Sequence, residues 1–311
     1  MIGEGIGKTG SQRQRHFAEL ALIGNTIVWG ATFTLVKSAL GGVSAILFLA
    51  LRFSLASLAL TLIFRKPLVD LFRKPPTQRD ALKNAAPGLL VGLFLFLGYL
   101  LQTQGLRYTS APKSAFLTGL TSVLAPLFAS FVYGIKPRIS EVFGLLTALA
   151  GLALMTLPGA SGSINRGDLL TLFGAAAFAA HIVTLGHFSR EMRFELLSVM
   201  QVGTAAVLAI TLFPWAETPR VEWQPTVLWA ILITGLLATA LAFTVQAWAQ
   251  KFTTSTRTAL IYMLEPVVAW MTSYLLAGEG LSRPGAAGAA LILGGVLLVE
   301  LKPVNPRQHP S

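Results

Sequence analysis

The chain has no cysteine among its 311 residues. Disulfide bonds and thiolate metal sites are therefore excluded, and composition gives no indication of the redox compartment. Charged residues are also scarce, at 12% of the chain, whereas an average soluble domain has about 25%. Acidic residues are the rarer charged class, because 13 Asp and Glu face 24 Lys and Arg, which gives a net charge of +11. So low a charge content argues against an ordinary soluble domain.

Common catalytic motifs are missing as well. The sequence has no HExxH and no GxxxxGK[ST], so neither a zinc protease of that type nor an ATP-driven pump is supported. Residues 159–162 read Gly-Ala-Ser-Gly and match the GxSG string of rhomboid-type intramembrane proteases, which place this serine at the start of a buried helix. Here the polar residues that follow, up to Asp168, indicate a surface loop. The sequence therefore predicts no enzyme, no cofactor and no metal site.

What the chain has instead is long apolar stretches. Hydrophobic residues make up 54% of it, and ten stretches lie near the length of about 20 apolar residues (range about 17–25) that a transmembrane helix needs. The first stretch contains Asn25 and is followed by no clear small-residue cleavage site, so we interpret it as a retained helix and not as a signal peptide. The predicted spans are 17–39, 44–64, 85–105, 112–133, 140–158, 168–187, 196–214, 226–248, 256–277 and 286–301. They predict an all-α integral membrane protein with ten transmembrane helices.

The second half of the chain repeats the first. With an offset of 144 residues (246 − 102), residues 101–117 align with 245–261. Aligned pairs include Gln102 with Gln246, Thr109 with Thr253, Lys113 with Arg257, Gly144 with Gly288, and Gly151 with Gly295. Pro126 and Pro266 miss this alignment by four residues, which is about one helical turn. Because each repeat has an odd number of spans, the five-helix repeats 17–158 and 168–301 are predicted to be inverted relative to each other.

The distribution of basic residues predicts the orientation. With the N-terminus in the cytoplasm, 17 Lys and Arg lie on the inner side and 6 on the outer side, while Arg52 lies within a span. This bias favours cytoplasmic tails at both ends, residues 1–16 and 302–311. A net charge of +11 could also suggest nucleic-acid binding, but basic residues between apolar stretches are typical of orientation signals. We therefore expect membrane lipids around the protein and no nucleic-acid partner.

Four local motifs follow one another along the chain: Trp29-Gly30, Leu51-Arg52-Phe53, Arg107-Tyr108-Thr109-Ser110 and Leu264-Glu265-Pro266. In their order and spacing they resemble motifs of the EamA family of the drug/metabolite transporter superfamily. Phe178 departs from the family pattern, in which a tryptophan is frequent there. The resemblance covers essentially the whole chain, and within the family it points to amino-acid exporters of the YddG type. It implies inverted repeats around a central cavity, a location in the bacterial inner membrane, and export of small metabolites.

Glu265 is the most conspicuous candidate for function, because it lies near the middle of a predicted span, beside Pro266. On insertion scales an Asp, Lys or Arg at a helix centre costs about 2.5–3.5 kcal/mol, and a Glu should be comparably unfavourable. Its carboxylate should therefore face protein or water. Two interpretations are open: Glu265 binds a substrate amine or carries a proton, or it accepts hydrogen bonds from backbone donors freed by the proline.

Polar and aromatic residues form stripes at helical spacing on several spans. The stripes are Asn25, Trp29 and Thr32; Tyr99 and Gln102; Gly174, Phe178 and His181; Gln246 and Gln250; and Thr258, Tyr262 and Glu265. Since a lipid-facing surface has no use for Asn, Gln or His, the stripes are expected to meet around one cavity. The predicted substrate-binding residues are Asn25, Trp29, Tyr99, Gln102, His181, Gln246, Tyr262 and Glu265. Ordinary packing is the alternative for each aromatic residue, and an interhelical hydrogen bond is the alternative to a proton relay for His181.

Other notable residues lie near helix ends. Arg52 is expected either to snorkel to the interface or to meet a carboxylate, and Lys37 is expected to snorkel. Three tryptophans are expected to form an interfacial belt: Trp215, Trp223 and Trp229. The spans 140–158 and 286–301 are rich in Gly and Ala, which predicts close helix packing.

These features predict a transporter that exports small metabolites, most specifically amino acids, aromatic or other neutral ones among them. One repeat would rock against the other and expose a midplane cavity to each side in turn. A passive pore or a lipid scramblase, which needs no alternating access, is the alternative. The exact substrate, the energy coupling and the oligomeric state are left open.

Overall fold

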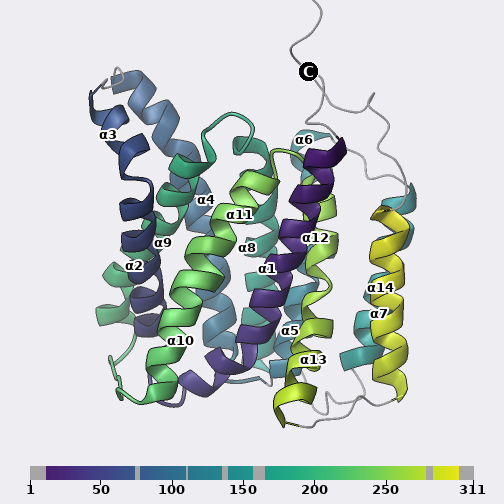
Figure 1. The fold of residues 1–311 in the computed structure, drawn as a ribbon. Helices are drawn as coiled ribbons and strands as arrows, with labels where there is room; N and C mark the ends of the chain where they lie inside the picture. The colour runs from purple at the N-terminus through teal and green to yellow at the C-terminus, as the bar shows by residue number, and fades with distance from the viewer. Residues whose placement is uncertain are drawn as a thin grey trace, which may run out of the picture.

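The computed structural model describes residues 12–73, 78–109, 111–134, 139–156, 165–277 and 283–300. Within these ranges the chain forms a bundle of helices (Figure 1), and its one extended feature is an isolated bridge between Val43 and Val221. Six of the helices described are long and apolar enough to cross a membrane, and three shorter apolar helices accompany them. The predicted all-helical membrane fold is confirmed.

The helices follow one another with short connections. They are α1 (Gln12–Ala39), α2 (Ala45–Ile63), α3 (Arg65–Arg73), α4 (Gln78–Gly105), α5 (Ala111–Gly119), α6 (Thr121–Tyr133), α7 (Ile139–Thr156), α8 (Arg166–Phe188), α9 (Phe194–Ala216), α10 (Pro225–Gly235), the π-helix η2 (Leu236–Leu241), α11 (Ala242–Ala249), α12 (Ser255–Tyr262), α13 (Glu265–Ala277) and α14 (Arg283–Glu300).

Each of the ten predicted spans has an observed counterpart. The largest differences are at the starts of α1 and α4, which begin at Gln12 and Gln78 instead of the predicted 17 and 85. Hydropathy misses these extra turns because they are polar. It also misses α3, a short helix whose basic residues interrupt the apolar pattern.

Two predicted spans are interrupted halfway along their length. The span 112–133 consists of α5 and α6, separated at Leu120, and the span 256–277 consists of α12 and α13, separated at Met263 and Leu264. With the offset of 144, Leu120 corresponds to Leu264, so the two interruptions coincide. Only the two prolines, Pro126 and Pro266, are therefore displaced from this alignment, by four residues. Interrupted helices at corresponding positions of two repeats are typical of binding sites in transporters.

Helices α7 and α14 approach each other at the backbone, at one edge of the bundle (Figure 1). A Cβ atom on Gly151 would lie 2.5 Å from the carbonyl oxygen of Gly288, and a Cβ atom on Gly295 would lie 2.5 Å from that of Gly144. No side chain fits at these distances, so glycine is required at both crossings. The predicted close packing is confirmed.

Two apolar clusters each include residues of α1. Phe48 and Phe53 of α2 are fully buried in a cluster that includes Leu95 of α4 and Val202 of α9. A second cluster includes buried residues of α8 and α12, among them Ile182 and Ile261. Trp29 packs against both clusters, so α1 joins the two parts of the core, and the candidate site lies where they meet.

The α7–α14 crossing generates a stability prediction. Gly295→Ala should lower the thermal unfolding temperature in detergent, because overpacking costs about 1–3 kcal/mol. Gly294 is the matched control on the same helix, since its added Cβ would have no neighbour within 4 Å. Gly294→Ala should leave stability unchanged or raise it slightly, because alanine is the better helix former. Equal effects of the two variants would contradict the packing argument.

Candidate functional site

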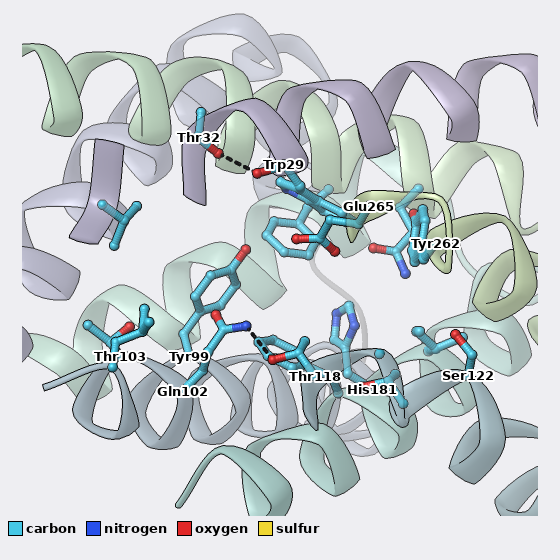
Figure 2. Close-up of a pocket in the computed structure, with 18 of the residues that line it drawn as sticks. Trp29, Thr32, Tyr99, Gln102, Thr103, Thr118, Ser122, His181, Tyr262 and Glu265 are labelled. Carbon is cyan, nitrogen blue, oxygen red and sulfur yellow. Dashed lines mark hydrogen bonds between the residues drawn. The ribbon is translucent and has the colours of Figure 1, made fainter. Parts of the chain in front are cut away.

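A cavity of about 100 Å³ lies inside the bundle, beside both interrupted spans (Figure 2). A water molecule needs about 10–15 Å³ on this measure, so the cavity has room for several waters or for part of a small metabolite. The lining residues are Trp29, Thr32, Val36, Arg52, Tyr99, Gln102, Thr103, Leu106, Thr118, Gly119, Thr121, Ser122, Phe178, His181, Ile182, Phe243, Gln246, Tyr262 and Glu265.

Every one of the sequence stripes contributes at least one residue to the lining of this cavity. Seven of the eight predicted binding residues line it, namely Trp29, Tyr99, Gln102, His181, Gln246, Tyr262 and Glu265. Asn25 does not. Its side-chain amide donates a 2.7 Å hydrogen bond to the carbonyl oxygen of Ala242, so it holds α1 against the start of α11 behind the cavity wall. Substrate binding by the seven lining residues stays a prediction.

Aromatic side chains form much of the wall. The ring of Trp29 contacts those of Tyr262, at a centroid distance of 4.8 Å, and Phe243, at 5.4 Å. The ring of Tyr99 contacts that of Phe178 at 5.1 Å in an edge-to-face arrangement, a favourable geometry for aromatic pairs. Phe178 thus forms part of the aromatic wall.

Arg52 corrects an expectation. It is only 3% exposed and lines the cavity, so it neither snorkels nor pairs with a carboxylate of the described chain. Its guanidinium group donates hydrogen bonds to the Thr239 hydroxyl (2.6 Å), the Tyr99 hydroxyl (3.1 Å) and the Ala238 carbonyl oxygen (3.2 Å). It also lies 4.3 Å from the centre of the Tyr99 ring. The motif Leu51-Arg52-Phe53 contained this residue, but hydropathy placed it too close to the interface.

The π-helix η2 explains why Arg52 stays inside. A π-helical turn is wider than an α-helical one and often marks a functional site. Here the carbonyl oxygen of Ala238 in that turn accepts hydrogen bonds from both Arg52 and the Trp29 indole nitrogen, the latter at 2.8 Å. Because unpaired carbonyl groups are costly in lipid, these two side chains are held at the cavity wall by the helix they satisfy.

Glu265 is the first residue of α13 and so lies at the interruption of its span. Figure 2 shows its carboxylate directed into the cavity, across from Thr118 and His181. Within the described chain this carboxylate forms neither a hydrogen bond nor an ion pair, so the capping interpretation gains no support. Gly30 makes the position possible, because a Cβ there would lie 2.8 Å from the Glu265 carbonyl oxygen.

His181 forms an interhelical hydrogen bond. Its Nε2 atom lies 2.8 Å from Oε1 of Gln201 on α9, and the Gln201 amide donates in turn to the Phe243 carbonyl oxygen at 3.5 Å. Gln201 is fully buried, and it was missed because it stands alone on its helix, without a stripe. This geometry matches the interhelical alternative, and the proton relay stays a prediction.

The two glutamines that the repeat pairs both reach the cavity. Gln102 donates to the Thr118 hydroxyl at 3.0 Å (Figure 2), and Gln246 donates to Gln250 at 3.3 Å. Gln250 itself lies behind the wall and donates to the Ile182 carbonyl oxygen. The pairing by sequence thus places two amides on one cavity.

Lys37 also corrects an expectation. It does not snorkel, because its ammonium group donates to the carbonyl oxygens of Leu106 and Thr109, just beyond the C-terminus of α4. A lysine satisfies such carbonyl groups well, since a helix C-terminus carries partial negative charge.

Buried polar clusters lie toward both ends of the bundle. At one end Glu19 accepts hydrogen bonds from Arg257, at 3.1 Å, and from Thr253, at 3.2 Å; we name these three residues the Glu19 cluster. At the other end Asp168 accepts a 2.7 Å hydrogen bond from Thr109; we name these two the Asp168 cluster. Glu19 is near the start of α1, whereas Thr109 bonds Lys37 near the end of that helix, so the clusters lie at opposite ends.

The repeat relates the two clusters. Thr109 corresponds to Thr253 at the offset of 144, and Glu19 corresponds to Asp168 at the offset of 149 that aligns Trp29 with Phe178 (178 − 29). Each of these two threonine–carboxylate hydrogen bonds therefore joins one half of the chain to the other, and the two bonds lie at opposite ends of the bundle.

Other predicted features lie away from the cavity. Trp215, Trp223 and Trp229 are exposed, as an interfacial belt requires. The Gly-Ala-Ser-Gly string at 159–162 lies outside the described residues. In the described part of the chain, no group of three or more His, Asp or Glu side chains could hold a metal ion.

Comparison with known proteins identifies the same family in both halves of the chain. The sequence pattern of the EamA-like transporter family matches residues 16–157 and again residues 165–301. A protein named an uncharacterized transporter, from Archaeoglobus fulgidus, is 35% identical over 93% of this chain and 87% of its own length. A probable terminal-alkyne amino-acid exporter of Streptantibioticus cattleyicolor is 23% identical over 94% of this chain and 96% of its own length.

Known structures agree on the fold. A solved crystal structure superposes with a TM-score of 0.74 at 20% identity, and the match covers 92% of this chain and 97% of the other. The family predicted from the local motifs is confirmed by these matches across both halves: this multi-pass membrane protein belongs to the EamA-like transporter family.

Proposed function

We propose that the protein is a carrier that exports amino acids or closely related small metabolites. The observation that carries this proposal is one internal cavity with aromatic walls that is lined by a basic and an acidic side chain, Arg52 and Glu265. An apolar pocket with a few polar groups suits a small amphipathic ligand. The printed name of the Streptantibioticus cattleyicolor relative, an amino-acid exporter, supports the substrate class.

The two halves are proposed to be inverted repeats, 17–158 and 168–301. At the α7–α14 crossing, Gly151 meets Gly288 while Gly144 meets Gly295. In the alignment Gly144 is equivalent to Gly288 and Gly151 to Gly295, so equivalent residues exchange partners. Such an exchange is what a two-fold axis between the halves produces.

The polar clusters at the two ends support alternating access. A carrier must close one end of its cavity while the other is open. The Glu19 cluster is almost fully buried, since Glu19 is 3% and Arg257 is 2% exposed, so it ties α1 to α12 at its end. The Asp168 cluster ties α8 to the α4–α5 connection at the other end. The hydrogen bonds of each cluster would break when the cavity opens at that end of the bundle.

The alternative functions need other features. A passive pore needs a polar path that stays open at both ends, whereas the Glu19 cluster closes one end with a buried ion pair. A lipid scramblase needs a polar groove that opens toward lipid, whereas the polar residues of this cavity come from helices that face one another inside the bundle, among them α1, α2, α4, α8 and α13. Transport in place of catalysis agrees with the names of the relatives. We also propose that the protein lies in the bacterial inner membrane, with both termini in the cytoplasm.

The carrier proposal predicts counterflow. Proteoliposomes loaded with unlabelled amino acids should accumulate labelled leucine or phenylalanine transiently and at saturable rates. The reason is that the binding site of a carrier reorients across the membrane faster when it holds substrate than when it is empty. Empty liposomes and liposomes loaded with glucose are the controls. Uptake that rises linearly with concentration and shows no counterflow would indicate a pore, and movement of labelled lipid would indicate a scramblase.

The orientation can be tested with single cysteines, because the chain has none of its own. Thr218 and Glu191 are both exposed, in the α9–α10 and α8–α9 connections. A membrane-impermeant maleimide added to intact cells should label Thr218→Cys and leave Glu191→Cys unlabelled until the cells are broken. The reverse pattern would overturn the orientation.

The Glu19 cluster can be tested as a gate. Removing one partner of a buried ion pair costs about 3–5 kcal/mol in the state that contains it, so Glu19→Gln should favour the state open at that end. In a background with Thr118→Cys in the cavity, maleimide labelling in inside-out vesicles should then accelerate at least about tenfold. Arg193→Gln is the control, because it removes an exposed ion pair with Glu195. Unchanged labelling in Glu19→Gln would show that the cluster is not a gate.

A further inference from the structure

The cavity is lined by a guanidinium group and a carboxyl group that do not pair with each other. Arg52 reaches it from α2 and Glu265 from the start of α13, and within the described chain the two side chains form no ion pair. We propose that they form a zwitterion site, in which Arg52 binds the carboxylate and Glu265 binds the ammonium group of one α-amino acid. The inference rests on the proposed export function and assigns the recognition of its substrate to two named residues.

Arg52 has a donor to spare. Its Nε and Nη2 atoms donate to Thr239, Tyr99 and Ala238, whereas Nη1 donates to no group in the described chain. All three acceptors are neutral. Among the described residues the buried guanidinium therefore has no counter-ion, and its hydrogen bonds to Thr239 and Ala238 hold it against the widened turn of η2. A carboxylate is the ligand group that fits this fork of donors best.

Tyr99 extends the carboxylate side of the site. Its hydroxyl oxygen accepts the hydrogen bond from Arg52, which leaves the hydroxyl hydrogen to donate elsewhere. In the described chain no other group bonds this hydroxyl, and Figure 2 shows it pointing into the cavity. A ligand carboxylate beside Arg52 can therefore accept a second hydrogen bond from Tyr99.

Glu265 provides the side of the zwitterion site that binds the ammonium group. Its carboxylate faces the same cavity (Figure 2) and has no donor in the part of the chain that the structure describes. An isolated ion in a poorly solvated site is costly unless it is paired. An ammonium group is the complementary partner, and the rings of Trp29 and Tyr262 beside it suit a cation through their π faces.

Two separated charges select against ligands with only one. A simple carboxylate would pair with Arg52 but leave Glu265 unpaired, and a simple amine would do the reverse. A site with buried polar groups discriminates strongly against a ligand that leaves one of them without a partner. The aromatic wall of Phe178 and Phe243 would then accommodate an apolar side chain.

The test compares leucine with its two single-charge analogues, 3-methylbutylamine and 4-methylpentanoate. Binding to the purified protein is measured by calorimetry, and competition is measured in leucine counterflow. The wild type should bind leucine at least about tenfold more tightly than either analogue, because hydrogen bonds to charged groups are the strong ones. Arg52→Gln should abolish the preference for leucine over the amine, and Glu265→Gln should abolish the preference for leucine over the carboxylate.

A changed preference among the three ligands distinguishes a loss of substrate recognition from a loss of folding. A variant that only folds poorly would lose affinity for all three ligands alike and keep their ratios. Arg52→Lys, which keeps the charge, should restore part of the preference for leucine over the amine. Arg107→Gln is the matched control, because Arg107 is exposed and stacks on Tyr108 outside the cavity. It should behave like the wild type.

Two results would overturn the inference, and they are distinguishable. If leucine is transported but Arg52→Gln keeps the wild-type preference over the amine, the zwitterion site is wrong while the export function stands. If 4-methylpentanoate binds as well as leucine and neither phenylalanine nor leucine shows counterflow, the cavity is an anion site, and the amino-acid proposal fails with it.

Discussion

The structure depends on one constraint of the bilayer: every backbone polar group in the membrane needs a partner within the protein. Continuous α-helices meet this requirement by themselves, but this bundle contains two interrupted spans and one π-helical turn. Side chains complete the backbone at these places. Trp29 and Arg52 bond Ala238 in the π-turn, and the Ser122 hydroxyl bonds Ala259 at the end of α12.

The same side chains bring the cavity wall into position. At the end of α12 the N–H group of Met263 bonds Leu260 and not Ala259, so the Ala259 carbonyl oxygen is available to Ser122 on α6. This contact joins the two interrupted spans across the halves of the chain. The irregular helices and the polar residues of the cavity are therefore parts of one arrangement, in which Arg52 bonds the π-turn and still has Nη1 without an acceptor in the described chain.

Much of this architecture follows from the sequence, because lipid imposes simple rules. Apolar length located the ten spans, and polar stripes located seven residues of the cavity. What the sequence could not show was the course of the backbone between them. The roles of Asn25, Arg52 and Lys37 all depend on carbonyl groups at a π-turn or a helix end, and hydropathy contains no information on where such groups lie. Gln201 was missed for a related reason, because a single amide on an apolar helix has meaning only with His181 opposite it.

The glycine crossing of α7 and α14 has a consequence for movement. If the halves exchange conformations during transport, most contacts between them must break at one end and form again at the other. The two crossings, Gly144–Gly295 and Gly151–Gly288, are equivalent to each other in the repeat. When the two halves swap conformations, each crossing takes the place of the other. This pair of contacts can therefore stay closed throughout. Carbonyl groups packed against glycine offer no interlocking side chains to resist a small rotation. This edge of the bundle is thus suited to be the stationary pivot about which the rest of the protein turns.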